Sequence, residues 1–132
     1  MNILYLLNET IKENILLGSE IDDDKLKQIL VKANLYELIK SLPDGIDTKI
    51  SSNGQEISGG ERQRIAIARA LVKDVDFIFV DESTSQLDPV NRTEIEKILL
   101  NLENVGVIMI SHNFNDETLK SFDEIIDLKK FS

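Results

Sequence analysis

The chain has 132 residues, of which 42% are hydrophobic and 30% are charged. This balance is typical of one globular domain with a core, not of a disordered segment. No apolar run approaches the length of a membrane span, and the lack of cysteine excludes disulfides and thiolate metal sites. The net charge of −9 argues against a nucleic-acid groove, which needs a basic face.

The first third of the chain has apolar residues at helical spacing. Between Leu26 and Ile39 they recur mostly three and four positions apart, so we expect mostly helix over residues 9–42. Pro43-Asp44-Gly45 then predicts a turn. The polar stretch 51–56 predicts a loop before the second half of the chain.

The second half alternates helical segments with apolar runs. We expect helices at residues 59–72, 89–102 and 116–121, and strands at 77–80, 105–110 and 123–128. The first two strands are continuous apolar runs, which are typical of strands buried on both faces. This alternation predicts a parallel sheet with helical crossovers. Ligands of such sheets bind beyond the carboxyl ends of the strands, where Asp81-Glu82 and Ser111-His112 are expected.

The segment Ser58-Gly59-Gly60-Glu61 begins the predicted helix 59–72. One interpretation is a capping box, in which the serine hydroxyl and the glutamate carboxylate each accept a bond from the other's backbone amide. A second interpretation rests on the glycines. Each costs about 1 kcal/mol relative to alanine inside a helix, and both leave bare amides at the positive end of the helix dipole, where a phosphate can bind.

Two carboxylates follow the apolar run 77–80 directly. A carboxylate at a strand end can hold Mg²⁺ through its water shell, and neighbouring strand residues point to opposite sides, so Asp81 and Glu82 can hold separate roles. The alternative is a polar loop after a core strand. Further along, Asp88 followed by Pro89 predicts the N-cap and first residue of a helix.

His112 is the only histidine of the chain. A single histidine is most often structural, but its place at a strand end, on the same edge as Glu82, favours a functional role. Arg62, Arg64 and Arg69 form a basic patch on the predicted helix 59–72. We interpret these arginines as solvated or paired with acidic side chains, and not as phosphate ligands.

Taken together and in order, these segments resemble the ABC ATPases. Residues 56–71, which contain Ile57-Ser58-Gly59-Gly60-Glu61, resemble the family's signature, and Asp81-Glu82-Ser83-Thr84-Ser85-Gln86-Leu87-Asp88 resembles its Walker B and D-loop string. The resemblance implies part of a P-loop NTPase fold of the α/β class: a parallel sheet with flanking helices plus a helical subdomain. The helical subdomain would span about residues 8–57, and the core part, with the signature helix, Walker B and the switch histidine, would span residues 58–132.

The resemblance also implies a role for each motif residue. Asp81 would hold Mg²⁺ through water, Glu82 would be the general base that orients the attacking water, and His112 would be the switch histidine that contacts the γ-phosphate. The signature residues Ser58, Gly59, Gly60 and Glu61 would contact ATP that the opposite cassette of a dimer holds. Ser85 and Asp88 would belong to the D-loop at the dimer interface.

The sequence contains no Gly-x-x-x-x-Gly-Lys-[Ser/Thr] phosphate loop. Its first residues align with the family from about the Gln loop onwards, with Asn2 at the place of the glutamine. The expectation is therefore a C-terminal cassette fragment, inactive as an ATPase by itself and marginally stable, that depends on a phosphate loop from a partner or from an upstream segment.

Two stretches resemble the exporter-type cassettes of the family. Residues 6–15 and 41–48 resemble them, although Ser52 stands where they often have glutamate. This implies a second cassette and a transmembrane transport domain as partners, no nucleic acid, and a place at the cytoplasmic face of the plasma membrane. The alternatives are a non-catalytic truncated cassette that binds an intact one, and a decayed gene.

Overall fold

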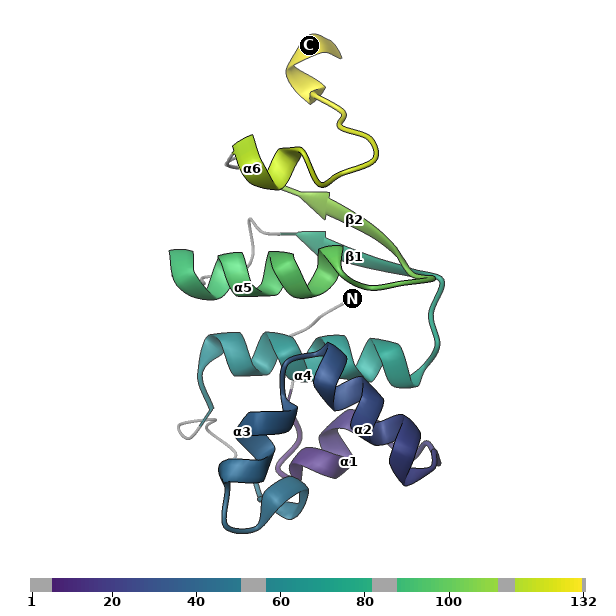
Figure 1. The fold of residues 1–132 in the computed structure, drawn as a ribbon, viewed down its shortest axis with the longest axis vertical. Coiled ribbons are helices and arrows are strands. Elements are labelled where there is room, and N and C mark those ends of the chain that lie inside the picture. Colours follow the sequence, from purple (N-terminus) through teal and green to yellow (C-terminus); the bar gives the residue numbers. More distant parts are fainter. Residues whose placement is uncertain (1–5, 51–56, 82–87, 112–115, 132) are drawn as a thin grey trace.

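The computed structural model describes residues 6–50, 57–81, 88–111 and 116–131 (Figure 1). Its elements, in chain order, are α1 (Ile11–Leu16), α2 (Asp23–Lys32), α3 (Tyr36–Ser41), the 3-10 helix η1 (Gly45–Asp47), α4 (Gly59–Val72), β1 (Phe77–Asp81), α5 (Pro89–Leu100), β2 (Gly106–Ile110), α6 (Asp116–Leu119) and the 3-10 helix η3 (Leu128–Phe131). In the described ranges, no helix is both long and apolar enough to cross a membrane.

Helix α4 lies at the centre of the molecule. It contacts α1 and α2 on one side and α5 on the other, and Figure 1 shows it between the helices of the first third and the sheet with α5. Its buried positions include the large Ile65 and Ile67 and the small Ala68 and Ala70. The small residues let neighbouring helices approach closely, so this central helix is held by packing on both sides.

The first third of the chain is mostly helical, as the apolar spacing predicts, but in three pieces. Helix α1 ends at Leu17 and Gly18, both with positive φ (47° and 84°), and Asn34 follows α2 with φ of 56°. Such left-handed residues end helices because the chain cannot continue its helical path through them. Near α1, Thr10 and Lys49 form an antiparallel bridge that brings the two ends of this helical part together.

The predicted parallel sheet is confirmed for its first two strands. β1 and β2 pair in parallel, in a register that runs from Phe77 opposite Gly106 to Asp81 opposite Ile110. Helix α5 is the crossover between them. Two parallel strands joined by a helix form a βαβ unit, which places the carboxyl ends of both strands at one edge.

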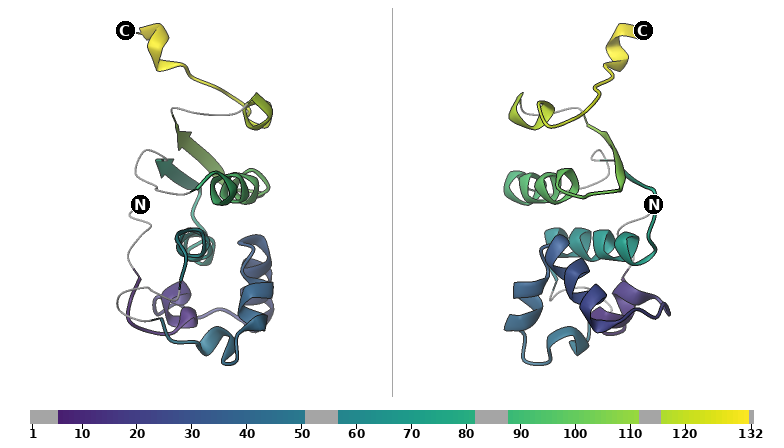
Figure 2. Two further views of the ribbon diagram at one scale, coloured as in Figure 1. Left: turned by 90° about the vertical axis from the view of Figure 1, so that its left-hand side faces the viewer. Right: turned by 45° about the vertical axis from the view of Figure 1, so that its right-hand side comes forward.

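The expectation that these strands are buried on both faces is wrong. Ile78 and Val80 are only 2% and 7% exposed, whereas Phe77 and Phe79 are 66% and 46% exposed. Figure 2 shows α5 on one side of the sheet. An apolar run gives no information about which layers cover each face, and in the described chain only the face toward α5 is covered.

The predicted third strand is also wrong. Residues 123–127 have no regular structure and lead into η3, and the described sheet has two strands. The segment extends away from the rest of the molecule (Figure 2), and Ile125, Ile126 and Leu128 are more than half exposed. A strand needs the edge of a neighbour for its backbone bonds, and this segment does not lie against one.

Candidate functional site

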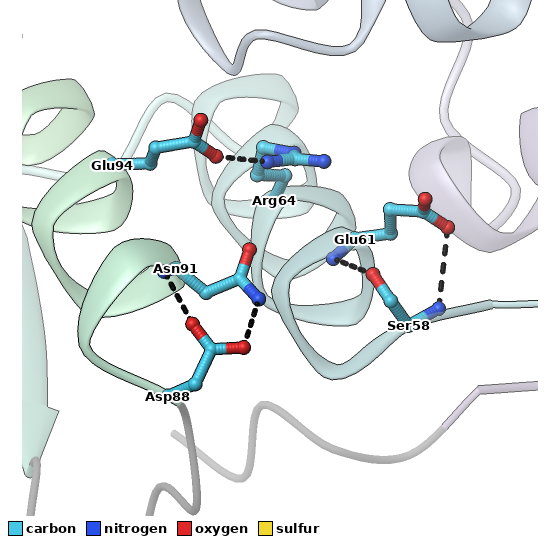
Figure 3. A network of polar contacts seen from close by, with 6 residues as sticks. All are labelled: Ser58, Glu61, Arg64, Asp88, Asn91 and Glu94. Atoms are coloured by element: carbon cyan, nitrogen blue, oxygen red, sulfur yellow. Dashed lines mark hydrogen bonds and ion pairs between the residues drawn. The ribbon is translucent and has the colours of Figure 1, made fainter.

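The start of helix α4 is a complete capping box (Figure 3). The Ser58 hydroxyl accepts a bond from the Glu61 backbone N–H at 3.2 Å, and the Glu61 carboxylate accepts one from the Ser58 backbone N–H, also at 3.2 Å. The capping box therefore satisfies the backbone N–H groups of Ser58 and Glu61. The amides of Gly59 and Gly60 lie between them, at the positive end of the helix, and have no acceptor within α4.

Gly60 is buried where α4 packs against Asn91 of α5. A Cβ atom on this residue would lie 2.4 Å from Asn91 Oδ1 and 2.8 Å from Asn91 Cγ, which is closer than real Cβ contacts allow. Gly59, one residue earlier, is exposed. The two glycines therefore differ in role. Gly60 is needed for the packing of α4 against α5, whereas Gly59 lies exposed at the surface.

Helix α5 begins with the cap that the sequence predicts. Asp88 is the N-cap and Pro89 is the first helical residue. The Asp88 carboxylate accepts two bonds from Asn91, from the backbone N–H at 2.8 Å and from the side-chain amide at 2.9 Å (Figure 3). The backbone bond from Asn91 is the main cause that lowers the pKa of Asp88, because it favours the charged carboxylate.

One of the arginines of α4 pairs with an acid, as interpreted from the sequence. The Arg64 guanidinium lies 2.9 Å from the Glu94 carboxylate, one turn beyond the contact of Gly60 with Asn91. Glu94 belongs to α5, so this pair and that contact join the first two turns of the same two helices (Figure 3). The spacing requires α4 and α5 to run parallel, with both helix starts at one end.

Arg69 takes part in a buried contact that sequence reasoning missed. Its Nη2 donates to Asn14 Oδ1 at 3.0 Å, and its Nε donates to the Asn14 backbone carbonyl at 2.5 Å. Burial lowers the pKa of Arg69. The signal in the sequence is Asn14 itself, a polar residue of poor helix propensity within the helical segment Ile11–Leu16.

Asp81 ends β1 and is partly buried. It lies opposite Ile110, the last residue of β2, so Asp81 and the following Ser111 lie at the same edge of the sheet. Helix α5 starts from this edge too, and the contacts of Gly60 and Asn91 bring the start of α4 there (Figure 1). The predicted site residues Glu82, Ser85 and His112 lie outside the described residues.

A family model of ABC transporters matches residues 4–85, more than half of the chain. The chain belongs to the ABC transporter family. Two relatives are ATP-dependent lipid A-core flippases. That of Burkholderia pseudomallei (strain K96243) is 38% identical over 127 residues, which cover 96% of this chain and 21% of the relative. That of Francisella novicida is 38% identical over 126 residues, which cover 93% and 21%.

A solved structure of a bacterial Atm1-family ABC exporter with ATP bound matches with a TM-score of 0.69 and 32% identity, over 85% of this chain and 20% of that chain. This match confirms the expected fold, the P-loop NTPase fold of ABC cassettes. The ABC transporter chain described here spans about a fifth of the length of these proteins.

Within this ABC fold, Asp81 suits the predicted Mg²⁺ role by its chemistry. Mg²⁺ keeps several waters and takes one or two carboxylates, and Asp81 presents a carboxylate at the strand-end edge. Its role, and the roles of the signature and D-loop residues, remain predictions from the family's motifs. The structure adds that Ser58, Gly60 and Asp88 lie on two adjoining helix starts.

Proposed function

We propose that this chain is part of an ATP-hydrolysing cassette of an ABC exporter, and that it supplies the signature side of an ATP site. The observation that carries this proposal is the start of α4. The capping box binds the amides of Ser58 and Glu61, while Gly59 and Gly60 provide amides at the positive helix end. A nucleotide phosphate is the natural ligand of such a helix start in this family.

The signature acts on ATP that the opposite cassette holds. The exposed Gly59 lets a phosphate approach the helix start, because glycine has no side chain of its own. The Ser58 hydroxyl contacts the same γ-phosphate while its capping bond keeps it at the helix end. Glu61 keeps the turn in place through its bond to the Ser58 amide. The helix dipole adds stabilisation of the phosphate charge.

The hydrolytic residues lie at the sheet edge. Asp81 would hold Mg²⁺, which neutralises charge on the β- and γ-phosphates when bound. Glu82 orients the water and accepts its proton as the new bond from water to phosphorus forms and the bond to the leaving ADP oxygen breaks. His112 donates to the γ-phosphate. These residues act on ATP that a phosphate loop of the same cassette would hold.

The partners follow from the same proposal. ATP binds between two cassettes, and its binding and hydrolysis drive a transmembrane transport domain, which places the chain at the cytoplasmic face of the plasma membrane. Residues 8–57 would form the helical subdomain and residues 58–132 the core part. The similarity to two lipid A-core flippases and to an Atm1-family exporter supports an exporter.

A second candidate is a non-catalytic truncated cassette that offers its signature to an intact cassette. In this case Asp81, Glu82 and His112 would not contribute to turnover, and only the start of α4 would act.

The first experiment tests the signature role with Gly59→Glu. This change adds a carboxylate at an exposed first position of α4, where a negative charge is favourable for the helix, so the fold is retained while ATP phosphates are repelled. The purified chain is mixed with the separately expressed cassette of the Burkholderia pseudomallei flippase, and MgATP-dependent association is measured by analytical ultracentrifugation. Gln28→Glu, on the exposed side of α2, is the control with the same added charge.

We expect association of the wild type and of Gln28→Glu, and loss of association for Gly59→Glu. Equal association of all three proteins would contradict the signature role. The second experiment separates the two functions. The N-terminal cassette segment of the same flippase, which would supply a phosphate loop, is added as a separate polypeptide. ATP turnover that disappears in Glu82→Gln supports a catalytic cassette, whereas turnover indifferent to this change supports the non-catalytic one.

A further inference from the structure

Two adjacent contacts join the first two turns of α4 and α5. Gly60 of α4 lies against Asn91 of α5, and Arg64 pairs with Glu94 at 2.9 Å (Figure 3). On α4 the two contacts are four residues apart, and on α5 they are three apart, so each helix presents both on one face. The starts of the two helices are therefore fixed in register and not merely adjacent.

The carboxamide of Asn91 lies between a hydrogen-bond partner, Asp88, and a packing neighbour, Gly60. Its Nδ2 donates to Asp88 Oδ2 at 2.9 Å, while its Oδ1 and Cγ fill the space that a Cβ on residue 60 would need. An ionised carboxylate only accepts hydrogen bonds, so the amide nitrogen must face Asp88 and the oxygen must face Gly60. The planar amide therefore connects the D-loop aspartate to a signature glycine without an intervening flexible group.

We propose that Asn91 is a positioning residue, which holds Asp88 relative to Gly59 and Gly60 so that D-loop and signature move as one unit. The proposal rests on the signature function described above. A shift of Asp88 moves the Asn91 amide through their bond. On its other side the amide lies against Gly60, in the space that a Cβ on residue 60 would need. Movement at one motif is thus transmitted to the other over a single side chain.

The chain by itself tests this connection. Asp88→Ser keeps one oxygen for the backbone N–H of Asn91, and so keeps the helix cap, but removes the second oxygen, which accepts the bond from the side chain. We expect this change to move the amide NMR resonance of Gly60. In an Asn91→Ala background the same change should leave that resonance in place. A Gly60 resonance that is equal in the wild type and in Asp88→Ser would overturn the proposal.

The effect on function is tested with Asn91→Asp. This change keeps the size of the side chain and suits the first turn of a helix, but it replaces the N–H donor with an oxygen that repels Asp88. We expect MgATP-dependent association with the flippase cassette to weaken about tenfold, the usual effect of losing one bond to a charged group. Gln28→Glu is again the control with the same added charge.

Each association is measured well below the melting midpoint of the variant, so that every protein is folded. Equal affinity of the wild type and Asn91→Asp would overturn the positioning role. If the wild type itself does not associate, the proposed function fails, and the Gly60 resonance still decides whether Asn91 connects the two motifs.

Discussion

The buried carboxamide of Asn14 holds the beginning of the described chain onto the central helix. The side chain is fully buried (0% exposed). Its Oδ1 accepts from Leu7 N at 2.7 Å and from Arg69 Nη2 at 3.0 Å, and its Nδ2 donates to the carbonyls of Leu7 at 3.0 Å and Thr10 at 2.9 Å. One side chain therefore joins the segment before α1, the helix α1 and the helix α4.

Asn14→Ala removes all of these side-chain bonds. Each neutral bond contributes about 1 kcal/mol, and the bond to the charged Arg69 about 1.5–3 kcal/mol. Alanine returns a few tenths of a kcal/mol through helix propensity, and water can reach the backbone of the exposed Leu7. We therefore expect a loss of about 2–4 kcal/mol in the free energy of unfolding, and a melting midpoint lower by about 10 °C.

Thermal and urea unfolding followed by circular dichroism measure this loss. The control is Asn8→Ala, which changes the same residue type at an exposed position in the same segment and should stay within about 0.5 kcal/mol of the wild type. If Asn14→Ala also stays within that range, the interpretation of Asn14 as the link between the first segment and α4 is wrong.

Three further predictions use other parts of the structure. Gly60→Ala should lower the free energy of unfolding by about 1 kcal/mol, because the new Cβ displaces Asn91, even though alanine favours a helix over glycine. Adding Asn91→Ala should restore stability, since the nearest remaining atom would be the Cβ of residue 91 at 3.3 Å. Simple additivity of the two changes in urea melts would contradict this. The lowered pKa of Asp88 means that its stabilisation is present above the ordinary aspartate pKa and is lost as the pH falls through the folded-state value. The difference in unfolding free energy between the wild type and Asp88→Asn should therefore shrink as the pH falls below the ordinary aspartate pKa of about 3.9. A difference that stays constant would refute the cause given for the shift. Phe79 and Ile108 are 46% and 49% exposed on the uncovered face of the sheet. Replacing both with threonine should reduce self-association, measured by light scattering, with little loss in the free energy of unfolding. Unchanged scattering would show that this face does not drive association.

Local signals in the sequence predict the helix starts of the site correctly. The serine and glutamate of the capping box and the Asp-Pro pair of α5 act on amides within three residues of themselves, so their neighbours in the sequence are also their partners in space. The same holds for the bounds of α4, whose predicted range 59–72 is the observed one. The parallel pairing of β1 and β2 follows from the single helix between them.

Contacts between distant segments could not be predicted in this way. Arg69 donates a hydrogen bond to Asn14, which lies 55 positions earlier in the sequence. Nothing in the sequence around either residue indicates that the other is its partner. The one-sided burial of β1 depends on which layers cover the sheet, and the apolar run of residues 77–80 fits one covered face as well as two. Residues 123–128 have strand-like composition, but a strand also needs a free edge beside it, and composition does not supply that information.

The parallel arrangement of α4 and α5 has an electrostatic consequence. Parallel neighbours repel each other slightly, since their dipoles are aligned, and each places about half a positive charge at the shared end. A protein of net charge −9 thus has an end where part of the positive potential comes from backbone amides. Peptide dipoles do not titrate, so this part of the attraction for anions stays constant across the pH range in which the protein is folded. The pH dependence of anion binding there arises from the anion's own titration and from side chains such as Asp88.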